Sequence, residues 1–427
     1  MKPAIGRLLT RTLTSPTLRT TRRRLLAWRR TRQGKPAVLH YFHEAADPYS
    51  HLAAQMLPAI AARYRITITP HLVSPPDAAA APDAERLACW ARRDAALLAR
   101  ATGLNMPANA QPPAETTTAH LNAALAAAIA HGDFAATAIA AGTALWRGEP
   151  LPTHPQASPS ETQAALATGN ALRLKLRHYL GATFHFEGEW YWGIDRLHHL
   201  ERRLTEQGLD TTPAAPPLMP VRDVTLSGPP GTAQGRVLHM YLSFRSPYSY
   251  IAVPRAQALA AHYGAELKLR FVLPMVMRGL PVPSAKRIYI MLDTKREAER
   301  LNLPFGKSVD PVGLGVERGL AVLHHAIPAG QGAAFALSFL QGAFADGIDA
   351  TTQSGLHQMA TRANLPTALV TAALADETWR ATAEENRAEM LQAGLWGVPC
   401  FRVDNGPMVW GQDRLWVIEQ ALAAAAA

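Results

Sequence analysis

Apolar residues fall into two similar series along this 427-residue chain. In each series a short apolar run meets a polar turn with a proline and then an apolar stretch at helical spacing, which predicts a strand leading into a helix. A second strand, a long helical region rich in Ala and Leu, a hairpin and a final helix complete each series. The predicted strands and hairpins are 38–42, 66–72 and 183–192, then 237–242, 266–272 and 400–410. This order predicts an α/β fold in which each half has a small mixed sheet.

The two series also match residue by residue. Asp47-Pro48-Tyr49-Ser50 corresponds to Ser246-Pro247-Tyr248-Ser249, Asn170–Thr183 to Asn386–Pro399, and W-G-I-D-R-L at 192–197 to W-G-Q-D-R-L at 410–415. Several anchors in the same order favour a tandem duplication over chance. We therefore predict a basic N-terminal extension at 1–36, a first domain at 37–207, a linker rich in Pro and Gly at 208–235 and a second domain at 236–427.

The net charge of +10 comes almost entirely from residues 1–36, which carry eleven Lys and Arg and no acid. The rest of the chain is close to neutral, so its charge gives no reason to expect nucleic acid as a partner. The basic segment suits a solvated extension, a transit peptide, an amphipathic helix on an anionic membrane, or a helix packed back on the protein. Its sequence leaves these alternatives open.

Two cysteines, Cys89 and Cys400, lie far apart and form no C-x-x-C motif. Dithiol redox chemistry and a structural zinc site therefore have no basis in the sequence, and so few cysteines suit a reducing, cytoplasmic location. No uninterrupted apolar run is long enough to span a membrane. The alanine-rich segment 121–146 comes nearest, but His131-Gly132-Asp133 interrupts it, which predicts a pair of buried helices.

Three stretches of the second half carry the candidate chemistry. Ser246 suits the N-cap of a helix whose first residue is Pro247, so its hydroxyl lies where a helix N-terminus favours an anion. The loop 394–399 ends in Pro399, which enters a strand and is a candidate for a cis peptide bond. The turn at 410–415 leads into the last helix, with Asp413 as the expected N-cap.

S-P-Y-S at 246–249, G-V-P at 397–399 and G-Q-D-R at 411–414, in this order, resemble the DsbA-like thioredoxin-fold family. Within it the resemblance is to 2-hydroxychromene-2-carboxylate isomerases and kappa-class glutathione transferases. Lys286, Tyr289 and Asp293 fit that family's K-x-x-Y-x-x-x-D pattern. The resemblance covers about 237–424 well and 38–206 in degraded form. It implies two tandem thioredoxin-like domains, each with an inserted helical subdomain.

The resemblance implies glutathione as the cofactor and a small electrophilic molecule as the substrate. Ser246 would stabilise the glutathione thiolate, which adds to the substrate and is later eliminated. The backbone of Val398, before a cis Pro399, would pair with the cysteinyl backbone, and Gln412 and Asp413 would hold the γ-glutamyl group. The substrate-binding candidates are Tyr248, Arg278 and Lys286. The last two would anchor a substrate carboxylate, since the lysine or asparagine usual in the family is missing.

The first half lacks this constellation. Asp47 stands in the position of Ser246, and its carboxylate would repel a thiolate; Thr183 stands in the position of Pro399. We expect a non-catalytic domain that acts as a covalently attached pseudo-subunit, with a homodimer also open. His43, Glu44 and Asp47 have no further ligand at chelating spacing, so no metal is expected. Cys400 and the pairs His198-His199 and His324-His325 are interpreted as structural.

Two other functions remain open at this stage. The chain could be a DsbA-like thiol–disulfide oxidoreductase, although the missing C-x-x-C argues against it. It could also be a non-catalytic binding or scaffold protein that the basic segment holds at a membrane surface.

Overall fold

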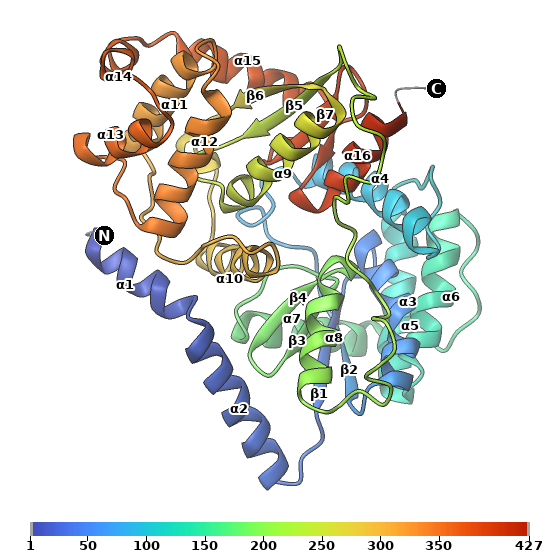
Figure 1. Cartoon of the computed structure of the whole chain (residues 1–427). Helices are drawn as coiled ribbons and strands as arrows, with labels where there is room; N and C mark the ends of the chain where they lie inside the picture. The colour runs from blue at the N-terminus through green and yellow to red at the C-terminus, as the bar shows by residue number, and fades with distance from the viewer. Residues whose placement is uncertain (1–2, 425–427) are drawn as a thin grey trace. The chain divides into compact units, whose positions relative to one another are not determined.

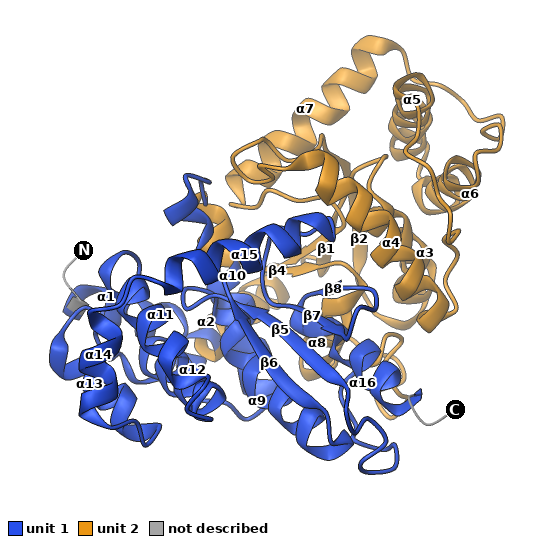
Figure 2. Cartoon of the chain, turned by 90° about the horizontal axis from the view of Figure 1, so that it is seen from above, with its two compact units in different colours: residues 1–19, 222–282, 290–427 blue, residues 20–221, 283–289 orange. Residues whose placement is uncertain are grey.

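The computed structural model describes residues 3–424 and divides the chain into two compact units (Figures 1 and 2). The N-terminal unit comprises 20–221 and 283–289, and the C-terminal unit comprises 1–19, 222–282 and 290–427. Each unit contains one four-stranded sheet in a thioredoxin-like arrangement. The linker expected at 208–235 is shared between the units, because 208–221 belongs to the first and 222–235 to the second.

The sheet of the N-terminal unit has the strand order β2-β1-β3-β4. β1 (Val38–His43) pairs in parallel with β2 (Thr67–Leu72) and antiparallel with β3 (Thr183–Phe186), which forms a hairpin with β4 (Glu189–Trp192). The first crossover helix is α3 (Pro48–Arg63). The other helices are α4 (Ala84–Thr102), α5 (Glu115–His131), α6 (Phe134–Arg147), α7 (Pro159–Lys175) and α8 (Leu197–Glu206).

The sheet of the C-terminal unit has the equivalent order β6-β5-β7-β8. β5 (Val237–Leu242) pairs in parallel with β6 (Glu266–Phe271) and antiparallel with β7 (Cys400–Val403), which forms a hairpin with β8 (Val409–Trp410). The crossover helix is α9 (Pro247–Tyr263). The remaining helices are α10 (Ser284–Arg300), α11 (Leu314–Ala326), α12 (Gly332–Gln341), α13 (Gln353–Arg362), α14 (Thr367–Leu374), α15 (Trp379–Gln392) and α16 (Leu415–Ala423).

Both central strands are buried almost throughout, as expected for a strand covered on both faces. Leu39, Tyr41 and Phe42 in β1 have no exposed surface, and neither do Leu238 and Met240 in β5. The strand boundaries predicted from apolar patterning agree with the structure to within one residue at most ends. The alanine-rich segment forms the expected helix pair, with α5 ending at Gly132 in the left-handed conformation (φ 84°).

The basic N-terminal segment is helical. It forms α1 (Pro3–Leu13) and α2 (Pro16–Arg32). Among the described residues, no helix combines the length and the hydropathy that a bilayer crossing requires.

Candidate functional site

Ser246 lies between β5 and α9 and caps the helix, as its sequence predicts. Its hydroxyl accepts a hydrogen bond from the Ser249 N–H at 3.1 Å, and Pro247 occupies the first turn. The same hydroxyl donates to the Val398 carbonyl oxygen, with 3.4 Å between the two oxygens. An O–H···O bond of this length is weak. The Ser246 proton is therefore held loosely, beside the positive end of a helix dipole.

Val398 and Pro399 form a cis peptide bond, also as the sequence predicts. The preceding Gly397 is required sterically, because a Cβ there would lie 2.1 Å from the Trp410 ring. Among the described residues no hydrogen-bond acceptor is found for the Val398 N–H. The loop thus presents a free N–H and a weakly bonded carbonyl beside the Ser246 hydroxyl.

Tyr248 is held by a buried carboxylate. Its hydroxyl donates to Asp293 Oδ2 at 2.7 Å, and Arg296 donates to Asp293 Oδ1 at 2.9 Å. Asp293 is 1% exposed. The pair recurs in the N-terminal unit, where the Tyr49 hydroxyl donates to Asp94 Oδ2 at 2.7 Å. The interaction therefore supports the first turn of the crossover helix in both units.

Gln412 is buried and engaged by its neighbours. Its amide nitrogen donates to Glu297 Oε2 at 3.2 Å and to Asp413 Oδ1, while Arg255 donates to its backbone carbonyl at 3.0 Å. Gln412 thereby orients the partly exposed carboxylate of Asp413. Sequence patterns did not indicate Arg255 or Glu297, since neither has a local motif that distinguishes it from an ordinary helix residue.

The expected capping role of Asp413 is wrong. A short 3₁₀ turn covers Gln412–Arg414, so the position before the turn is Gly411 and the position before α16 is Arg414. Neither position makes a side-chain cap hydrogen bond. The extra turn moves the start of α16 beyond Asp413, which local sequence did not indicate.

Arg278 reaches the loop that carries the cis peptide bond. It ends a 3₁₀ turn at Met275–Arg278, and its Nη2 donates to the Trp396 carbonyl at 3.2 Å. Burial lowers the pKa of this guanidinium, and the charge of Arg387 acts in the same direction. It remains a cation, because guanidinium groups titrate far above neutral pH.

Lys286 belongs to the N-terminal unit, whereas the other candidate residues belong to the C-terminal unit. Its Nζ donates to the Ala80 carbonyl at 2.8 Å and lies 6.0 Å from the centroid of the Tyr179 ring. Burial lowers its pKa to about 8.

The equivalent position in the N-terminal unit is closed by its own side chains. Ser50 Oγ accepts from the Ala182 N–H at 2.9 Å and from the Glu44 N–H at 3.1 Å, and it donates to Asp47 Oδ2 at 2.8 Å. Ala182 corresponds in sequence to Val398, so the amide that is free in one unit is bonded in the other. Thr183 is fully buried in β3.

Two partly buried acids, Glu44 and Asp47, accompany this closed turn. Burial raises the pKa of Glu44, and the charge of Asp47 raises it further; burial also raises the pKa of Asp47, although hydrogen bonds from Ser50 and Tyr49 oppose this. Both pKa shifts disfavour additional negative charge at this position.

Cys400 is a core residue, as expected. Its thiol is fully buried and donates to the Gly397 carbonyl at 2.8 Å, and burial raises its pKa well above the ordinary value. A buried thiol with a raised pKa is a poor nucleophile. Its position gives no support to a thiol–disulfide role.

A family model for the DSBA-like thioredoxin domain matches residues 237–423. No curated protein sequence matches the chain. A 2-hydroxychromene-2-carboxylate isomerase structure is 23% identical, with 44% of this chain and 94% of the other covered and a TM-score of 0.37. A probable DsbA oxidoreductase from Streptomyces coelicolor is also 23% identical, with coverage of 44% and 89% and a TM-score of 0.34.

A third similar structure is the cytosolic disulfide reductase DsbM from Pseudomonas aeruginosa with GSH. It is 19% identical to this chain, with coverage of 44% and 96% and a TM-score of 0.33.

Proposed function

We propose that the domain at 237–423, which matches the family model for DSBA-like thioredoxin domains, binds glutathione and holds its thiol as a thiolate beside Ser246. The reaction is addition of the thiolate to a small electrophilic molecule, in an isomerase or transferase resembling 2-hydroxychromene-2-carboxylate isomerase. The observation that carries this proposal is the free Val398 N–H next to the loosely bonded Ser246 hydroxyl.

The Val398 backbone suits a peptide ligand. Its N–H and C=O lie on one residue beside the cis bond, which is the pair of groups that an added extended strand uses. The cysteinyl residue of glutathione offers the complementary N–H and C=O. Binding in this mode would give the Val398 N–H a hydrogen-bond acceptor. No existing hydrogen bond of that N–H would have to be broken, so the new bond favours binding.

Ser246 would supply the donor to sulfur. A free thiol has a pKa of about 8.5 and is mostly protonated at neutral pH. A hydroxyl that turns from the Val398 carbonyl to the ligand sulfur, together with the N-terminus of α9, favours the anion. Glutathione supplies the nucleophile, and Ser246 stabilises it without forming a covalent bond.

The charged groups of glutathione have partners in the same unit. Asp413 would accept from the γ-glutamyl ammonium, and Gln412 would fix the Asp413 carboxylate, as it already does in the structure. Arg278, through its contact with the Trp396 carbonyl, is the candidate for a substrate carboxylate. Tyr248 would line the substrate side, with its hydroxyl held by Asp293.

The N-terminal unit would be a duplicated, non-catalytic partner domain in this proposal. Its corresponding amide at Ala182 is bonded to Ser50, and partly buried acids with raised pKa values occupy the turn. Lys286, which belongs to that unit and bonds to its Ala80 carbonyl, would then support the domain and not the reaction.

Glutathione binding measured by calorimetry tests the proposal. We expect the full-length protein to bind, Ser246→Ala and Asp413→Ala each to weaken binding about tenfold, and Asp47→Ala to leave it unchanged. Thiolate absorbance of the bound ligand, followed against pH, should give a thiol pKa below about 8.5 for the wild type and a higher one for Ser246→Ala. No binding by the wild-type protein would remove the proposed function.

A further inference from the structure

Helix α1 presents threonines to the protein and leucines to solvent. Thr10 Oγ1 accepts from the Ser308 N–H at 3.1 Å, and Thr14, the first residue after the helix, is 4% exposed. On the opposite face Ile5 and Leu8 are 49% and 65% exposed. An ordinary surface helix buries its apolar face, so this orientation is reversed.

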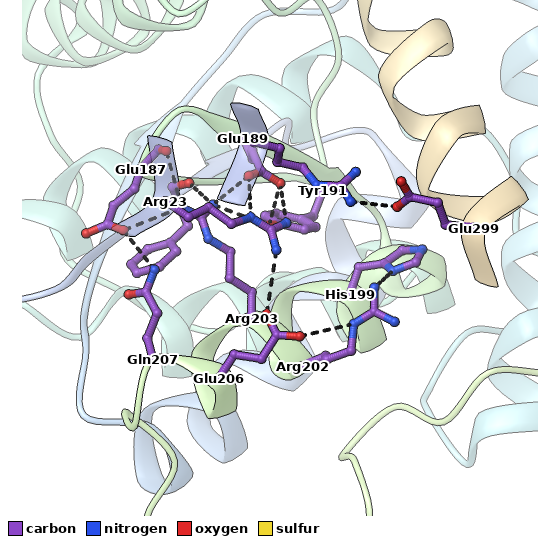
Figure 3. Close-up of polar contacts among 12 residues, drawn as sticks. Arg23, Glu187, Glu189, Tyr191, His199, Arg202, Arg203, Glu206, Gln207 and Glu299 are labelled. Carbon is purple, nitrogen blue, oxygen red and sulfur yellow. Dashed lines mark hydrogen bonds and ion pairs between the residues drawn. The ribbon is translucent and has the colours of Figure 1, made fainter. Parts of the chain in front are cut away.

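Helix α2 has the same reversed orientation. Figure 3 shows Arg23 directed at Glu189; both guanidinium bonds are 2.7 Å long. Arg30, two turns later on the same face, is paired with Glu187. No described residue of α2 is buried. Arg23 and Arg30 thus hold α2 to the N-terminal unit, and Leu25 and Trp28 of the helix are exposed to solvent.

The outward face of α2 interleaves apolar and basic residues. Leu25 and Trp28, three residues apart, are 42% and 54% exposed. Arg24, Arg29 and Arg32 are exposed around them, and the Arg32 guanidinium lies 5.2 Å from the Trp28 ring centroid. Long basic side chains beside an exposed Trp and Leu are typical of helices that lie in a membrane interface.

We propose that α1 and α2 each present a docking face for an anionic lipid bilayer. The exposed leucines and Trp28 would insert among the acyl chains, and the exposed guanidinium groups of Arg24, Arg29 and Arg32 would contact the headgroups. Charge complementarity selects this occupant, because residues 1–36 contain eleven Lys and Arg and no acid while the rest of the chain is close to neutral. The ion pairs of Arg23 with Glu189 and of Arg30 with Glu187 determine which face of α2 stays exposed and could contact a membrane.

Flotation of the full-length protein with vesicles tests this proposal. We expect flotation with vesicles of equal parts phosphatidylcholine and phosphatidylglycerol, little with pure phosphatidylcholine, and loss of binding as salt is raised. The combined variant Leu8→Glu, Leu25→Glu, Trp28→Glu should bind about tenfold more weakly. Leu174→Glu is the matched control, since Leu174 is an exposed leucine (75%) on α7 that should not affect binding.

A second variant separates charge from apolar insertion. Replacing Arg24, Arg29 and Arg32 by Gln should remove the preference for phosphatidylglycerol, with circular dichroism and melting unchanged because all three are exposed. The proposal is overturned if wild type floats with neither vesicle, or if the glutamate variant floats as well as wild type. It is also overturned if that variant instead dissociates an oligomer in sedimentation and no flotation occurs, because the face then binds a second copy.

Discussion

Ser246 and Asp47 occupy corresponding positions in the two units, and the chemistry of the two turns differs because of single side chains. Ser246 donates to the Val398 carbonyl, and the Val398 N–H has no acceptor among residues 3–424. In the other turn Asp47 accepts from Ser50, whose oxygen takes the Ala182 N–H that corresponds to the free one. The unit with serine at this capping position leaves the Val398 N–H available to a ligand, whereas the unit with aspartate has the corresponding Ala182 N–H bonded to Ser50.

The partly buried acids of the closed turn, Glu44 and Asp47, predict a pH dependence of stability. Because burial raises their pKa, the folded protein keeps protons on Glu44 and Asp47 that the unfolded chain has already released. Folding stability should thus fall as the pH rises above about 4, and the loss ends once the raised folded pKa values are passed.

Glu44→Gln replaces one of these two acids with a side chain that does not titrate, so its contribution to the pH dependence of stability is lost. We expect the unfolding free energy of Glu44→Gln, relative to that of wild type, to increase by about 1–3 kcal/mol between acidic and neutral pH. Denaturation followed by circular dichroism at several pH values measures this. Glu161→Gln is the control, since hydrogen bonds from Ser158 lower the Glu161 pKa and its effect should appear only in acid. A constant difference between wild type and Glu44→Gln would contradict the assignment.

At the scale of elements, the N-terminal helices show how ion pairs decide which face of a helix is exposed. α2 has an arginine on nearly every side, so its sequence does not select a docking face. Glu187 and Glu189 at the β3–β4 hairpin select it by pairing with Arg30 and Arg23. Arg203, which is 1% exposed, also lies within 3.6 Å of Glu189 and holds that carboxylate in place (Figure 3).

Arg23→Ala should loosen α2 from its hairpin. The change removes two charge-assisted hydrogen bonds of a pair that is 19% exposed on each side, a loss of about 1–2 kcal/mol. Amide hydrogen exchange in α2 should then become about tenfold faster. Arg24→Ala, an exposed residue one position along, should leave exchange unchanged. Equal exchange in both variants would show that the Glu189 pair does not hold the helix.

For the whole molecule, two sheets of equivalent strand order do not mean two equivalent sites. The order β2-β1-β3-β4 recurs as β6-β5-β7-β8, and the Tyr–Asp hydrogen bond of 2.7 Å recurs with it. The C-terminal unit has a cis peptide bond before Pro399. In the N-terminal unit the residue that corresponds to Pro399 is Thr183. Scaffold interactions are therefore shared by the two halves, while the candidate site lies in one.

One glutathione per chain is the expected stoichiometry. Asp47→Ser restores the serine of the other half but leaves Ser50 bonded to the Ala182 N–H, so it should not create a second site. Calorimetric titration of wild type and Asp47→Ser measures this directly. Two sites in either protein would contradict the view that the N-terminal unit is closed to the ligand.

The sequence by itself determined the α/β order of each half, the strand boundaries, the Ser246 cap and the cis bond before Pro399. These depend on local periodicity and on residues with narrow backbone preferences, which act over a few positions. The same reasoning was wrong about the Asp413 cap, because a 3₁₀ turn, which local patterns do not report, displaced the helix start.

Only the tertiary structure decided which polar groups are already hydrogen-bonded or ion-paired within the protein. Long-range contacts bring Ser50 to the Ala182 N–H, Arg255 and Glu297 to Gln412, and Arg23 to Glu189. Each of these pairs joins residues far apart in the chain or on elements whose relative placement depends on packing, so no periodic pattern encodes them. The difference between an open turn and a closed one is therefore a property of the folded molecule.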